Sequence, residues 1–422
     1  MKKIFYILFL LVMIIPTLAG QPKGYNITFV LEDQQEKMLF IVGNYGYQYY
    51  IVDSALIRKN HTARFQSKDK IIYDGIYQLT DRDGRSYFEF IIDHNRNFTI
   101  STRSDYPFRN PKIENSDENK AFFEYQKLKE GVPELSPEYL AGFTETAPSS
   151  LLSLYIKTEQ SANEAPVADV SNKSDLFFDH IDFSNPSILR MPVNYGVELF
   201  FTRLTGPHPD TIIRQIDRFI TETVSHTEVR HYFLDYLMRL FDHGDPRYDA
   251  VLVHLFDRYC PEQKCEWLDE YSSRRFSRET ARKRKLLPGQ QVPPLRAFDR
   301  DSHPTGTADL GHRYIILWFW DPDCEDCLEQ TPILYEFYQA NKEVYDIEVY
   351  AVSVTEDLER WERFIDENDL QWINVSFANG EPNYDFVDYF DLITTPGIYV
   401  IDDRHTIIDR QFPLEKLPFI FD

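Results

Sequence analysis

An uninterrupted apolar run lies just before a Cys-x-x-Cys sequence in the C-terminal third of this 422-residue chain. Residues 314–320 contain no charged side chain, which favours a strand buried on both faces. Cys324 and Cys327 follow, and the apolar side chains of residues 328–341 recur at helical spacing. The order predicts a pair of thiols at a strand-to-helix junction, where free N–H groups and the helix dipole stabilise a thiolate.

The spacing of the two cysteines favours thiol–disulfide exchange. Cys324 opens the helix and is the expected nucleophile, and Cys327 lies one turn further on, within reach of a mixed disulfide formed by Cys324. Glu325 and Asp326 stand between them, and two carboxylates oppose a nearby thiolate. A less stabilised thiolate makes the reduced form less stable, so we expect a reductant or a moderate exchanger rather than a strong oxidant.

The rest of the chain divides into blocks of different periodicity. Residues 20–112 hold short runs rich in β-branched and aromatic residues, which predict an all-β sandwich-like domain. Residues 113–285 have apolar positions at helical spacing and predict a central α-helical domain. Residues 286–422 alternate strand and helix patterns, which predicts an α/β domain. A basic stretch at 272–285, interpreted as a solvated helix, leads into this domain.

The first residues have the pattern of a signal peptide. Lys2 and Lys3 precede an apolar stretch over residues 4–15, and small residues allow cleavage after Ala19. The stretch is shorter than the roughly 20 residues that span a bilayer. We therefore expect residues 1–19 to be removed, leaving a periplasmic protein with no stable membrane insertion.

The charge of the chain excludes some partners. A formal net charge of −23 argues against nucleic acid and anionic membrane surfaces, which require clustered Lys and Arg. No pattern of metal ligands or cofactor motif stands out, so we expect neither a metal nor a cofactor.

Three segments of the last block resemble the TlpA/ResA-like branch of the thioredoxin superfamily. Residues 318–327 are similar to the active-site segment of that family, residues 288–299 to the beginning of its domain, and residues 394–402 to its cis-proline loop and the next strand. The resemblance implies a thioredoxin-like fold and a thiol-disulfide oxidoreductase.

The same resemblance implies roles for individual residues. Pro396 would be the cis-proline that faces the cysteine pair, the backbone of Thr395 would dock extended substrate, and Trp320 would contribute to substrate binding. Trp318 departs from ordinary thioredoxins, which keep a buried acid there for proton transfer. The implied partners are protein disulfides and thiols of the envelope, with a membrane electron donor that resets the pair.

The second cysteine pair leaves alternatives open. Cys260 and Cys265 lie at the end of a predicted helix. A local structural disulfide is the first interpretation, two free thiols the next, and a second redox pair a third.

Other functional classes fit the sequence less well than thiol–disulfide exchange. A zinc-binding structural protein would use all four cysteines. A peroxidase of the same fold needs Pro and Thr where Leu317 and Asp321 stand. A non-catalytic envelope protein could bind a partner and carry a vestigial redox domain. The sequence favours an exported thiol-disulfide oxidoreductase, with the non-catalytic binding protein as the alternative.

Overall fold

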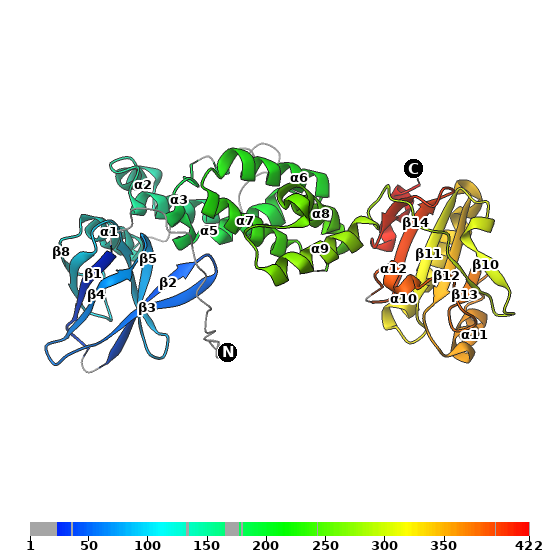
Figure 1. Cartoon of the computed structure of the whole chain (residues 1–422), viewed down its shortest axis with the longest axis horizontal. Coiled ribbons are helices and arrows are strands. Elements are labelled where there is room, and N and C mark those ends of the chain that lie inside the picture. The colour runs from blue at the N-terminus through cyan, green and yellow to red at the C-terminus, as the bar shows by residue number, and fades with distance from the viewer. Residues whose placement is uncertain are drawn as a thin grey trace. The chain divides into compact units, whose positions relative to one another are not determined.

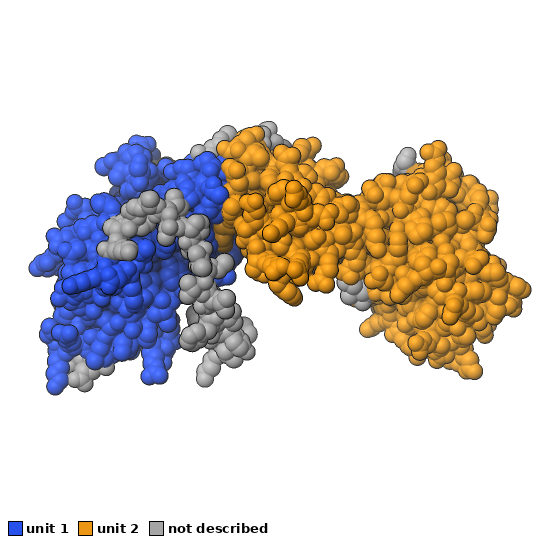
Figure 2. All heavy atoms as spheres, viewed as in Figure 1, with its two compact units in different colours: residues 1–206, 223–229 blue, residues 207–222, 230–422 orange. Residues whose placement is uncertain are grey.

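A computed structural model describes residues 23–34, 37–131, 135–164, 177–178, 180–242, 244–392 and 394–421 (Figure 1). The predicted signal peptide, residues 1–19, lies outside them. The chain forms two compact units, residues 1–206 with 223–229, and residues 207–222 with 230–422 (Figure 2). Within the described parts, no helix combines the length and apolar character needed to cross a membrane.

The first unit begins with two four-stranded sheets, of order β4-β1-β7-β8 and β3-β2-β5-β6. Their core is aromatic: the ring of Phe29, on β1, lies 5.9 Å from Phe88 and 5.0 Å from Phe90, both on β6 of the other sheet. The expected N-terminal β-sheet domain is confirmed. Its strands are β1 Lys23–Leu31, β2 Met38–Tyr45, β3 Gln48–Leu56, β4 Thr62–Ile71, β5 Gly75–Asp81, β6 Ser86–Ile92, β7 Asn97–Thr102 and β8 Lys112–Glu114.

Helices follow, and the boundary between the two units falls among them, so the three-domain division stays a proposal. Helix α6 shows why these segments are helical, because Ile212 and Ile216, one turn apart, are both buried. The principal helices are α1 Asp117–Gly131, α2 Pro137–Thr144, α3 Leu151–Glu164, α5 Val193–Leu199, α6 Pro209–Arg218, α7 Thr227–Leu240, α8 Asp249–Tyr259 and α9 Glu270–Arg284. Short helical turns between them are η2 Pro186–Arg190, η3 Phe200–Leu204, η4 Phe219–Thr223, η5 Pro246–Tyr248 and η6 Pro261–Gln263.

The C-terminal part of the second unit is a seven-stranded sheet of order β10-β9-β13-β12-β11-β14-β15. Strands β11, β12 and β13 are parallel, and β14 runs antiparallel to β11. The strands are β9 Arg296–Phe298, β10 Pro304–Gly306, β11 Tyr314–Trp320, β12 Ile347–Ser353, β13 Ile373–Ser376, β14 Gly397–Asp402 and β15 Ile407–Arg410. The helices are α10 Glu325–Tyr345, α11 Leu358–Glu367 and α12 Phe386–Tyr389, with short turns at η7 Thr307–Asp309 and η8 Leu414–Phe419.

Strand β11 is apolar throughout because both faces of the sheet are covered. Trp318 packs on one face with Leu334 of α10 and Trp361 of α11. Phe319 packs on the opposite face with Phe386 of α12. Successive side chains of β11 therefore point to opposite faces of the sheet, and each face packs into its own hydrophobic core. The expected α/β, thioredoxin-like domain is confirmed.

Candidate functional site

The cysteine pair lies where β11 gives way to α10. Cys324 is the N-cap of α10, and its backbone N–H donates to the carbonyl of Asp321 at 3.1 Å. Its sulfur accepts the backbone N–H of Cys327 at 3.3 Å. A sulfur in the N-cap position sits among the unsatisfied N–H groups of the first turn, which is where negative charge is favoured.

The two sulfurs have different surroundings. Both cysteines are free thiols, with Cys324 partly exposed and Cys327 completely buried. Burial raises the pKa of the Cys327 thiol to about 12, and its hydrogen bond with Cys324 adds to the effect. Cys324 is therefore the thiol that a partner molecule can reach, and Cys327 is held protonated beneath it.

The loop before β14 lies against Cys324. The peptide bond between Thr395 and Pro396 is cis, and the Cys324 thiol donates to the Thr395 carbonyl at 3.2 Å. Gly397 follows, and a Cβ atom there would come within 2.8 Å of the Leu392 side chain. Only glycine fits without displacing that side chain, so the loop is packed closely at this point.

Trp318 lies beneath the site and makes a hydrogen bond of its own. Its indole N–H donates to the hydroxyl of Thr331, on α10, at 3.2 Å, and both side chains are completely buried. An indole is a donor only and cannot take a proton from Cys327. The backbone of Asp321 and the side chain of Thr395 each lower the pKa of the Cys327 thiol, although burial and the contact with Cys324 outweigh them. The influence of the Thr395 side chain on this pKa was not expected from the sequence.

Trp320 differs from its expected role in substrate binding. Its side chain is 0% exposed and stacks obliquely on Phe364 of α11, with ring centroids 4.9 Å apart. A side chain with no accessible surface cannot contact a substrate in this conformation. Its position in a strand buried on both faces explains the difference.

Charged residues surround the exposed cysteine. Asp323, the residue before Cys324, forms an ion pair with Arg360 of α11. The sequence carries no signal for this pair because 37 positions separate the two residues. Glu325 and Asp326, in the first turn of α10, are exposed, so water and salt screen their effect on the thiol.

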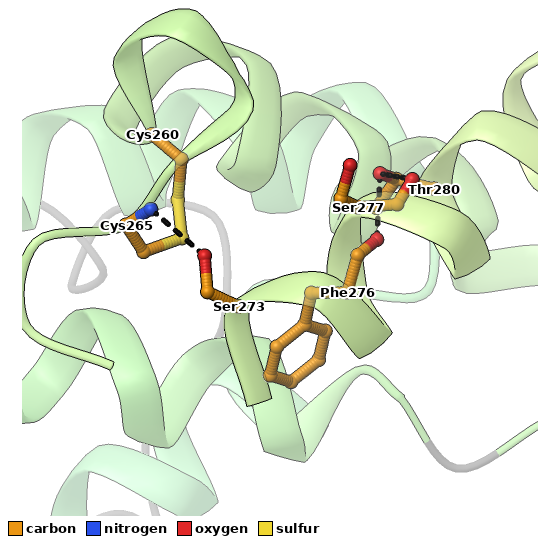
Figure 3. Close-up of a disulfide and its surroundings, with 6 residues drawn as sticks. All are labelled: Cys260, Cys265, Ser273, Phe276, Ser277 and Thr280. Atoms are coloured by element: carbon orange, nitrogen blue, oxygen red, sulfur yellow. Dashed lines mark hydrogen bonds between the residues drawn. A yellow bond between two sulfur atoms is a disulfide. The ribbon is translucent and has the colours of Figure 1, made fainter. Parts of the chain in front are cut away.

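The second cysteine pair is a disulfide (Figure 3). Cys260 caps the end of α8, and the backbone N–H of Cys265 donates to the hydroxyl of Ser273, on α9, at 3.2 Å. The two residues are 2% and 1% exposed. Because the sulfurs are shielded from solvent thiols, the bond has the surroundings of a structural link between α8 and the segment that enters α9.

Among the described residues, one group of potential metal ligands lies outside the cysteine pair. Asp299, Asp301 and His303 offer ligand atoms within 4.8 Å of one another. The Asp299 carboxylate already accepts the backbone N–H groups of the other two, at 3.0 and 2.8 Å, as in an ordinary turn. A zinc site of four thiolates needs four free cysteines, and the disulfide leaves only Cys324 and Cys327.

Comparison with known proteins places the C-terminal domain. A sequence profile of the thioredoxin-like family matches residues 311–407. A domain of a possible thiol-disulfide isomerase from Cytophaga hutchinsonii is 31% identical over 32% of this chain and 89% of its own length, with a TM-score of 0.30. The thioredoxin domain of a thiol-disulfide oxidoreductase from Bacteroides vulgatus is 20% identical over 32% of this chain and 99% of its own, with a TM-score of 0.29. No curated protein matches the chain.

Proposed function

Through its C-terminal domain this chain belongs to the thioredoxin-like family, and we propose that it is an exported thiol-disulfide oxidoreductase that reduces envelope proteins through Cys324 and Cys327. One observation carries the proposal: the partly exposed sulfur of Cys324 caps α10 and accepts the backbone N–H of Cys327, whose own thiol is buried one turn later. This arrangement separates an attacking sulfur from a resolving one.

The reaction proceeds in two exchanges. The Cys324 thiolate attacks one sulfur of a substrate disulfide, that disulfide breaks, and the departing substrate thiolate takes up a proton. Cys327 then loses its proton and attacks the Cys324 sulfur, which releases the second substrate thiol and forms the Cys324–Cys327 disulfide. The substrate gains two electrons and two protons, and a membrane electron donor would return two electrons to the pair.

Removal of the Cys327 proton is the step that most needs assistance, because the pKa of this thiol is raised to about 12. Trp318 cannot act as the base. The Thr395 side chain lowers the pKa of this thiol, so it favours the developing thiolate and is the side chain that we propose to assist the proton transfer.

The proposed direction of electron flow, from this protein to its substrate, is argued from the charges in the first turn of α10. Glu325 and Asp326 place two carboxylates beside a helix N-terminus that otherwise favours the thiolate. Their repulsion makes the reduced form less stable, and this supports the role of reductant. The signal-peptide pattern of residues 1–19 supports a periplasmic location, and the net charge of −23 supports protein rather than nucleic-acid partners.

Trapping of mixed disulfides tests the proposal. Cys327→Ser, incubated with a disulfide-containing peptide, is expected to accumulate a covalent adduct at Cys324 that mass spectrometry identifies. Cys324→Ser is expected to form no adduct and to lose all reductase activity. If both variants reduced the peptide as fast as the wild type, the non-catalytic binding protein would become the better explanation.

A further inference from the structure

The basic end of α9 contacts the segment that leads to Pro396, and both lie in the second unit. Arg282 forms an ion pair with Asp391 at 3.2 Å. The ammonium group of Lys285 lies 4.4 Å from the ring centre of Tyr389. Tyr389 is the last residue of α12, and Asp391 belongs to the connection between α12 and β14, a few residues before Thr395. The basic stretch, interpreted from sequence as solvated, thus has partners in the redox domain.

A buried ion triad holds the strands after Pro396 to the same helices. The carboxylate of Asp249, the first residue of α8, binds Lys283 of α9 at 2.6 Å and also pairs with Arg410 of β15. The three side chains are between 4% and 9% exposed. A buried carboxylate shared by two cations fixes their relative positions, since each charge needs its partner to offset the loss of water.

Strand β14 connects the buried ion triad to the cis-proline loop. Arg410 lies opposite Tyr399 in the β14–β15 pairing. The Tyr399 hydroxyl donates to the carbonyl of Phe390 at 2.7 Å, just before Asp391. The chain on both sides of Thr395 is therefore attached to α8 and α9.

Apolar packing completes the attachment. Leu286, two residues after the end of α9, is completely buried in the core that also contains Leu317, Phe319 and Phe390. The chain thus passes from α9 into the core of the redox domain, and packing restricts motion at this junction.

From these contacts we infer that the last turn of α9 positions the cis-proline loop for substrate docking, with Arg282 and Asp391 as the positioning pair. The inference rests on the proposed function, because the loop carries the Thr395 carbonyl that receives the Cys324 thiol at 3.2 Å. The residues of the helical region act here through the loop and touch no reacting atom.

Steady-state reduction of a disulfide-containing peptide by the full-length protein tests this role. Arg282→Gln is expected to raise KM about two- to five-fold, with little change in kcat. This factor corresponds to the interaction free energy of a partly exposed ion pair. Asp391→Asn is expected to do the same, and Arg282→Lys, which keeps the charge, to restore KM. Arg284→Gln is the matched control, because Arg284 is equally exposed on α9 but pairs with Asp257 of α8.

Hydrogen exchange provides a second measurement that needs no activity. The amides of Asp391 and Leu392 donate to carbonyls of α12, and Arg282→Gln is expected to speed their exchange about two- to five-fold, whereas Arg284→Gln leaves it unchanged. Unchanged exchange in both Arg282→Gln and Asp391→Asn would overturn the inference. If the wild type exchanged no disulfide, while Arg282→Gln still sped the exchange of these amides, the proposed function would be overturned and the contact between α9 and the loop would stand.

Discussion

The backbone N–H of Cys327 donates to the sulfur of Cys324 at 3.3 Å, although only Cys324 has accessible surface. The exposed sulfur is thus held by the helix that buries its partner. Because the same helix start supplies the stabilising N–H groups and the buried second thiol, both steps of the proposed exchange depend on α10 beginning at Glu325.

The pKa of Cys327 predicts a difference in alkylation. In the reduced protein the Cys324 thiol should react with iodoacetamide first at pH 8. The reaction of Cys327 should stay slow and rise about tenfold for each pH unit toward its pKa of about 12, because only the thiolate reacts. Peptide mass spectrometry after timed quenching measures both rates. In urea, where burial is lost, the two thiols should react alike, and equal rates in the folded protein at pH 8 would contradict the assignment.

Asp249 should be essential for stability. Asp249→Asn leaves Lys283 and Arg410 buried without their counter-charge, and breaking a buried pair in this way costs about 3–5 kcal/mol. Urea denaturation measures the loss. Asp257→Asn is the control, because its pairing with Arg284 is exposed and worth at most about 1 kcal/mol. Equal losses of unfolding free energy in the two variants would show that the buried triad contributes no more to stability than an exposed ion pair.

The disulfide between Cys260 and Cys265 should support the fold without taking part in exchange. Its short loop predicts that Cys260→Ala with Cys265→Ala lowers the unfolding free energy by about 2 kcal/mol. The same variant should reduce a disulfide peptide at the wild-type rate, since both sulfurs are buried. A loss of reductase activity in a folded double variant would instead indicate a second redox pair.

The pair of Asp323 and Arg360 should tune the redox potential in opposite directions. Asp323→Asn removes a negative charge beside Cys324 and should shift the potential of the pair upward, whereas Arg360→Gln should shift it downward. Both side chains are about half exposed, so solvent limits each shift to about 5–20 mV. Equilibration with glutathione measures it. In 1 M NaCl both shifts should shrink, and shifts of the same sign would refute the electrostatic explanation.

The sequence was sufficient where structure depends on local pattern. The apolar run that became β11 and the helical spacing after Cys327 predicted the order of strand, cysteine and helix, since burial on both faces and helical periodicity are visible in a short window. The fold classes of the β-sheet and α/β parts followed from the same patterns.

Contacts between distant segments could not be read in this way. Asp249 and Arg410 are 161 positions apart, and only the packing of α8 against the redox domain brings them together. The exposure of Trp320 depends likewise on Phe364 and α11, which cover that side chain. Arg282 and Lys283 looked solvated because Asp391 and Asp249, with which they pair, lie far from them in the sequence.

A redox titration of the protein against glutathione, read by alkylation and mass spectrometry at each cysteine, is the measurement to make first. We predict a reversible two-electron transition of Cys324 and Cys327 near about −270 mV, the range of thioredoxin, with Cys260 and Cys265 remaining oxidised throughout. A transition near about −120 mV would make the protein an oxidant. If Cys324 and Cys327 never exchange with glutathione, the protein is not a thiol-disulfide oxidoreductase.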